Sequence, residues 1–169
     1  MPIGDRPGRR LAALGCLVTI AVADYVIRRR RPPWIVVGLF DHPAHVATAV
    51  LIWLNLAGQR SRDGAWTKAY LAGSLLPDLD HIPLALRPVH PSPDDPRPVT
   101  HCLLAVAPVA AVNRAAAAGM LAHFARDLGV GTGVPLLWPA TRRSIRIPYP
   151  AYAAGCLLLA GRATLVDGL

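Results

Sequence analysis

Histidine and aspartate side chains gather at four places in this sequence, and both residue types can bind divalent metal ions or transfer protons. Only His90, among the six histidines, lies outside these groups. The groups fall at the edges of apolar stretches, where ionisable side chains are otherwise rare. Their members are Asp41, His42 and His45; Asp78, Asp80 and His81; His101; and His123 with Asp127.

The spacing within the groups suggests shared helix faces. His123 and Asp127 are four residues apart, so on one helix both could reach a single metal ion. A surface hydrogen bond is the alternative for this pair alone. Asp78 and Asp80 crowd two carboxylates together, and a divalent cation would offset the cost of burying them. Their alternative is a helix cap.

The remaining two groups also allow structural roles. His42 and His45 are three residues apart and could share a helix face, or could form hydrogen bonds at a membrane interface. Thr100 and His101 stand at the start of an apolar block, where either could cap a helix.

Taken together, the four groups predict helices that converge on one polar pocket, as in metal sites built inside helix bundles. The three cysteines are scattered through apolar runs and are interpreted as buried thiols, so oxygen and nitrogen ligands remain. Such a mixed set suits Zn, Mn, Fe or Mg without choosing among them. The donors exceed one coordination shell, so more than one ion fits. Metal-activated water would make the chemistry a hydrolysis.

The composition indicates which elements position these residues. The 169 residues are 53% hydrophobic and 17% charged, against about 25% charged in ordinary soluble domains. The mean hydropathy is +0.37 and the net charge is +8. These values exclude a disordered chain and a coiled coil, and we find neither strand alternation nor internal repeats. They favour an all-α, multi-helix, membrane-associated bundle, with a very apolar soluble core as the alternative.

Five apolar blocks predict five or six helices. Arg87–Pro98 is rich in proline and is expected to form a loop, and a break is expected at Asn113–Arg114. The longest stretch without a charge is shorter than a typical membrane span. The blocks are Leu11–Ile27, Trp34–Gly58, which DHPAH interrupts, Ala69–Leu86, Thr100–Asp127 and Ala151–Val166.

We divide the chain into an N-terminal basic and apolar anchor, residues 1–33, and a helical membrane domain, residues 34–169. Arg28–Arg31 follow the first block at once, which favours a retained anchor over a cleaved signal peptide. The same run is interpreted as contacting lipid headgroups, and no specific nucleic acid is expected as a partner. The apolar composition and these arginine clusters together favour association with a membrane.

Three segments resemble a known family. LLPDLDH (Leu75–His81), RPVTHCLLAV (Arg97–Val106) and GMLAHFARDLGVGTGVPLLWP (Gly119–Pro139) are similar to bacterial inner-membrane metal-dependent hydrolases, one branch of which is called LexA-binding. The resemblance covers Asp41 to Pro148. It implies a multi-helix, multi-pass protein of the bacterial inner membrane with a metal-dependent, hydrolase-like site.

The resemblance also implies site residues by position. The metal ligands would be His45, Asp78, Asp80, His101, His123 and Asp127. The catalytic residues would be Asp80, Arg97 and His101, with Arg97 holding an anionic group such as a phosphate. One departure stands out: the family has His-Arg-Gly where this chain has Pro96, Arg97 and Pro98.

We therefore expect a membrane-bound hydrolase that acts on an ester or phosphoester, in a small molecule or a lipid, with a divalent metal ion as cofactor. The missing family histidine motivates an alternative, a non-catalytic membrane scaffold or regulator that keeps the metal-site fold. A small metal transporter is a third hypothesis, because intramembrane aspartate and histidine also mark ion routes. Membrane lipids are the expected surroundings, and no protein partner is identified.

Overall fold

The computed structural model describes residues 6–30, 32–56, 63–81 and 100–165. Within these ranges the chain forms six α-helices, a π-helical turn η1 (Val26–Arg30) and a short 3-10 helix η3 (Pro77–Asp80). The α-helices are α1 (Arg6–Tyr25), α2 (Trp34–Asn55), α3 (Gly64–Gly73), α5 (Leu103–Val112), α6 (Arg114–Gly129) and α7 (Tyr149–Leu165).

The predicted all-α class is confirmed. Among the described residues the only β-pairing is an isolated bridge between Val134 and Ile145. The expected break near Asn113 is also present, since α5 ends at Val112 and the Asn113 side chain caps α6 by accepting a hydrogen bond from the backbone N–H of Ala116. The loop predicted over Arg87–Pro98 lies outside the described residues.

In two of the five apolar blocks, the helix boundaries differ from those that the sequence suggests. The DHPAH segment does not end a helix, because α2 continues through Pro43 while its apolar residues pack against α1 and α7. The block Ala69–Leu86 does not form one helix. Its first helix ends at Gly73, and Pro77 opens the 3-10 helix η3, since proline is tolerated only in a first turn. Residues 82–86 lie outside the described part.

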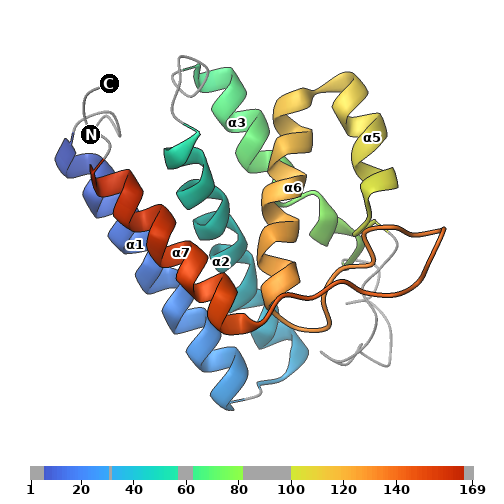
Figure 1. Cartoon of the computed structure of the whole chain (residues 1–169), viewed down its shortest axis with the longest axis horizontal. Coiled ribbons are helices and arrows are strands. Elements are labelled where there is room, and N and C mark those ends of the chain that lie inside the picture. Colours follow the sequence, from blue (N-terminus) through green and yellow to red (C-terminus); the bar gives the residue numbers. More distant parts are fainter. Residues whose placement is uncertain (1–5, 31, 57–62, 82–99, 166–169) are drawn as a thin grey trace.

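Helices α1, α2 and α7 lie side by side and form one half of the bundle (Figure 1). Their contacts are made largely by small side chains, which let helix axes approach closely, as is common between helices in membranes. Leu51 and Leu54 fill the space that remains. The small buried residues include Ala13 of α1, Ala44 and Ala47 of α2, and Ala160 and Ala163 of α7.

Helix α6 occupies the centre and contacts α2, α3, α5 and α7 (Figure 1). Its approach to α3 is a contact of backbones: a Cβ atom on Gly73 would overlap the backbone of Ala116, and one on Gly119 would overlap the carbonyl of Tyr70. Glycine at both positions therefore sets how close these helices lie. The end of α3 and the following η3 are brought against α6 in this way.

Two helical segments, Pro7–Arg30 and Ile35–Asn55, are long and apolar enough to cross a membrane by length and composition. Both expose large apolar side chains, including Leu11, Leu14 and Val18 on α1 and Leu39 on α2. Within the described ranges, Leu103–Val112 is a shorter apolar helix. The expectation of membrane association thus gains two candidate spans.

We predict that Gly119→Ala destabilises the protein by about 1–3 kcal/mol, because the added methyl group forces the backbones of α3 and α6 apart. Gly161→Ala is the matched control, since Gly161 is also helical but nothing lies near its Cβ position. Gly161→Ala should stabilise by about 0.5–1 kcal/mol. Unfolding of both variants in detergent checks this, and equal midpoints would contradict the close contact.

Candidate metal centre

Four segments that are distant in sequence bring ionisable side chains to one point beside α6. Helix α2 supplies His45, η3 supplies Asp78, the residue two positions before α5 is His101, and α6 supplies His123 and Asp127. The side chains of His45, His101, His123 and Asp127 are almost completely buried. Asp78 is 10% exposed. The arrangement is that of a polar pocket inside an apolar bundle.

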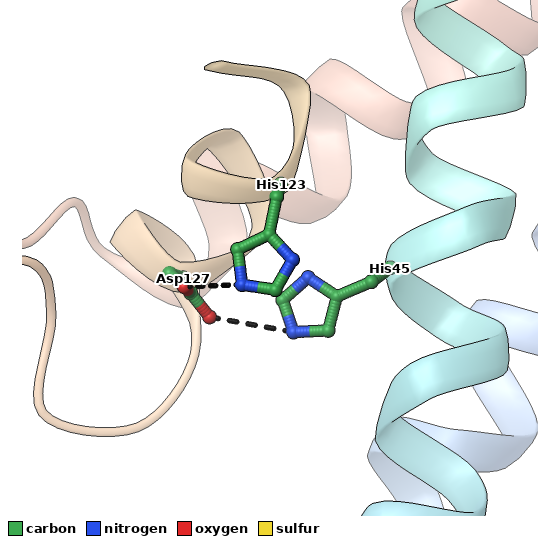
Figure 2. A group of neighbouring side chains, drawn as sticks. All are labelled: His45, His123 and Asp127. Carbon is green, nitrogen blue, oxygen red and sulfur yellow. Dashed lines mark ion pairs between the residues drawn. The ribbon is translucent and has the colours of Figure 1, made fainter. Parts of the chain in front are cut away.

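The carboxylate of Asp127 faces imidazoles on both sides. Its Oδ2 atom lies 3.0 Å from Nε2 of His123 and 3.6 Å from Nε2 of His101. Its Oδ1 atom lies 3.4 Å from Nε2 of His45. The rings of His45 and His123 stack with centroids 3.8 Å apart, so their Nε2 atoms point together toward Asp127 (Figure 2). His123 and Asp127, the pair predicted on one helix, therefore lie at the same site.

Asp78, in η3, lies close to two of the same imidazoles, those of His123 and His101. Its Oδ1 atom lies 3.5 Å from Nε2 of His123 and 3.8 Å from Nε2 of His101. His81 and His42 also approach this carboxyl group, at 3.2 and 3.3 Å. Burial by itself would raise the pKa of Asp78, but the nearby imidazoles of His101 and His81 hold that pKa well below its usual range. Asp78 is therefore a carboxylate, the form that binds cations.

The outer nitrogens of two histidines are already engaged. Nδ1 of His123 lies 2.9 Å from the carbonyl oxygen of Ser74, which can only accept, so Nδ1 donates and Nε2 is directed into the pocket. Nδ1 of His101 lies 3.3 Å from the hydroxyl of Thr100. A partner on the outer nitrogen fixes ring orientation and is typical of metal-binding histidines.

The donor set fits a divalent cation. Two overlapping triads, His45 with His123 and Asp127, and Asp78 with His101 and His123, each offer ligand atoms within 4.8 Å of one another. Nε2 of His123 and Oδ2 of Asp78 are buried and, although Asp127 and His42 approach them to 3.0 and 3.3 Å, neither atom makes a well-oriented hydrogen bond within the described residues. Buried polar atoms are costly when unsatisfied, and a shared cation satisfies several at once.

The same proximity affects His123. Burial disfavours its charged form, but the adjacent carboxylate of Asp127 outweighs burial and raises the pKa of His123 above its usual value. A proton and a cation therefore compete for this site, and metal binding is expected to release protons.

The sequence-predicted site residues are placed as follows. His45, Asp78, His101, His123 and Asp127 meet at this point, which we call the metal centre. His42 and His81 border it through Asp78, and His42 is half exposed. The side chain of Asp80 and the residues His90 and Arg97 lie outside the described part of the structure, so the roles of Asp80 and Arg97 stay predictions.

Sequence reasoning missed a second buried network next to the metal centre. Arg126 is completely buried and donates to Asp24 of α1 at 2.9 Å and to Asp41 of α2 at 2.7 Å. It also donates to the hydroxyl of Tyr152 at 3.2 Å. Tyr149 donates to the other oxygen of Asp24 at 2.9 Å. Three helices are thus tied to α6 through one guanidinium group.

This network adjoins the metal centre directly. Arg126 precedes Asp127 in sequence, and the second oxygen of Asp41 lies 3.6 Å from Nε2 of His45. Burial alone would lower the pKa of Arg126, yet the carboxylate of Asp41 raises it, so Arg126 stays charged. Two features of the sequence could have indicated this network. Asp24 lies inside an apolar block, and Arg126 lies between the candidate ligands His123 and Asp127.

Comparison with known proteins yields one match. A family model described as YdjM inner membrane protein matches residues 40–166, about three quarters of the chain. The match begins within α2, after α1, and includes all five residues of the metal centre, from His45 to Asp127. No curated protein and no solved structure matches the chain. The expected resemblance to an inner-membrane family is confirmed.

We predict that Arg126→Gln destabilises the protein by about 3–5 kcal/mol, because it leaves the carboxylates of Asp24 and Asp41 buried without their cation. Arg162→Gln on the exposed part of α7 is the control and should stay within about 0.5 kcal/mol of the wild type. Denaturation in detergent measures both. Equal stability of the two variants would show that the buried network contributes little.

Proposed function

The chain belongs to the YdjM inner membrane protein family, and we propose that it is a multi-pass membrane hydrolase that depends on a divalent metal ion and cleaves an ester or phosphoester. The metal centre would be the active site. Helices α1 and α2 would be the first two membrane spans, since each is long and apolar enough to cross.

One observation carries the proposal: three imidazoles and two carboxylates from four separate segments converge in an apolar bundle with their ligand atoms close together. An arrangement of this kind is expensive to bury without a cation and is characteristic of metal sites in helix bundles. A purely structural cluster would instead pair each imidazole with one carboxylate in a directional hydrogen bond.

The chain's own residues would divide the work of hydrolysis. His45, Asp78, His101, His123 and Asp127 would hold the metal, which when bound supplies a polarised water at neutral pH. Asp80 would accept the proton of that water and Arg97 would bind an anionic group of the substrate. His101 would act through the metal as a ligand, because Thr100 already engages its other ring nitrogen. In the overall reaction, the hydroxyl of water would be added to the acyl carbon or phosphorus, and its proton would go to the departing alcohol.

The donor set also bears on the metal. Oxygen and nitrogen ligands without thiolate suit Zn, Mn, Fe or Mg. The two oxygens of Asp127 face different imidazoles, His45 on one side and His101 with His123 on the other. Such a carboxylate can serve one ion or bridge two, and the measured stoichiometry decides between these.

We predict that purified wild-type protein carries stoichiometric divalent metal and that His123→Ala and Asp127→Ala lose it. The affinity should fall on the order of 100-fold or more, because each change removes a donor from the shared set. Elemental analysis after controlled reloading measures this. Asp63→Asn is the control, a carboxylate that caps α3 far from the centre, and it should keep its metal.

The same samples separate the two functions. Release of alcohol or phosphate from soluble ester and phosphoester probes, lost in both alanine variants, supports the hydrolase. Full metal content without turnover on either probe class would favour the scaffold or regulator, in keeping with Pro96 at the position of the family histidine. A wild type that binds no metal even after reloading would refute both forms of the proposal.

We further predict that Thr100→Val weakens metal binding by about 10–100-fold without unfolding the protein. The change keeps the side-chain shape but removes the hydroxyl beside Nδ1 of His101. Titration with a chromogenic metal chelator measures the affinity. Thr141→Val is the control, because the hydroxyl of Thr141 accepts from the backbone N–H of Arg143 and not from a residue of the centre. Equal affinities for the two variants would assign no orienting role to Thr100.

A further inference from the structure

An apolar groove runs between α1 and α2 and has a volume of about 550 Å³. This size lies within the range of roughly 300–1,000 Å³ common for small-molecule sites. Helices α1 and α2 lie next to each other along their length (Figure 1). The walls include Gly15, Cys16 and Thr19 from α1 and Pro43, Val46 and Val50 from α2.

The groove offers few polar groups along its walls. The hydroxyl of Thr19 donates to the carbonyl oxygen of Gly15 at 2.9 Å, so it is satisfied within its own helix. Nothing lies within 4 Å of the position that a Cβ atom on Gly15 would take, so the groove is open at this point. Walls of this kind favour an apolar ligand.

The groove lies next to the metal centre, because one of its lining residues contacts a residue of that centre. His42 and Leu75 both line the groove. The Nε2 atom of His42 lies 3.3 Å from Oδ2 of Asp78, and the other oxygen of Asp78 lies 3.5 Å from Nε2 of His123. A molecule seated in the groove with a polar end at His42 would therefore place that end beside Asp78, the most exposed of the five residues of the centre.

The groove also lies where hydrocarbon is expected. Its walls are the two candidate membrane spans, and the neighbouring outer faces of Leu14, Val18 and Leu39 are exposed and apolar. A second apolar hollow of about 340 Å³ shares Thr19 and Pro43 with the first and continues along the same pair of helices. The apolar path beside the centre is thus longer than one hollow.

We propose that this groove binds an acyl chain of a membrane phospholipid and places the ester or phosphoester end of that lipid at the metal centre. The inference rests on the proposed hydrolase and narrows its substrate to a lipid. It rests on the position of an apolar groove between two candidate membrane spans beside a cluster of imidazoles and carboxylates, because an amphiphile has an apolar chain and a polar end that match these two parts.

The test introduces larger side chains that fill the groove. Gly15→Leu puts a branched side chain into the open space, and Val46→Phe fills the same space from α2. Gly161→Leu is the matched control, because Gly161 is an exposed helical glycine on α7 with nothing near its Cβ position. Unfolding midpoint and metal content of each full-length variant establish that the fold and centre are intact.

The first readout is lipid retention. Each protein is reconstituted in palmitoyl-oleoyl phosphatidylglycerol vesicles, extracted in detergent, washed, and analysed for phospholipid per chain by mass spectrometry. Wild type and Gly161→Leu should retain lipid, and both groove variants should lose most of it. Equal retention in all four would overturn the proposal. So would a groove variant that changes only self-association by light scattering, which would assign the groove to a second copy.

The second readout is turnover by the metal-loaded protein. The KM for the long-chain phospholipid should rise on the order of tenfold in both groove variants, since each methylene that leaves an apolar site lowers affinity several-fold. The KM for a dibutyryl analogue should not change. Lipid retention that responds to the groove variants without any turnover keeps the groove and refutes the hydrolase. Turnover with unaffected retention and KM keeps the hydrolase and refutes the groove.

Discussion

The rest of the structure depends on one constraint, that charges buried in an apolar bundle must be compensated where they lie. Helix α6 carries Arg126 and Asp127 side by side in sequence, both completely buried. The guanidinium is matched by carboxylates from α1 and α2. The carboxylate of Asp127 is surrounded by three imidazoles from α2, α6 and the start of α5. Compensating both charges requires several helices to converge on α6, and this convergence defines the fold as much as apolar packing does.

Close backbone contact makes the convergence possible. Because Gly73 and Gly119 let α3 lie directly against α6, the carbonyl of Ser74 reaches Nδ1 of His123 and η3 follows with Asp78. On the other side, alanines at the α1, α2 and α7 contacts bring Asp24 within reach of Arg126. Small residues thus perform an electrostatic task here: they shorten the distances over which buried charges are neutralised.

Local patterns in the sequence predicted the helical class and the break at Asn113, because spacing along one helix and punctuation by proline and asparagine are short-range properties. The four groups of histidine and aspartate were also visible locally, but the choice of ligands among them rested on the family resemblance. Two features were not accessible in this way. The pairing of Arg126 with Asp24 joins residues 102 positions apart, and no local pattern encodes it. The continuity of α2 through Pro43 depends on packing against α1 and α7, which outweighs the local cost of proline.

The first helix has a larger part than an anchor. It precedes the residues matched by the family model, yet it supplies Asp24 to Arg126 and one wall of the apolar groove. A division of labour follows: the matched segments carry the groups that could hold a metal, while α1 completes the charge balance behind them and shapes the surface along which a lipid chain would lie. Differences in α1 would then alter which lipids fit while leaving the metal ligands in place.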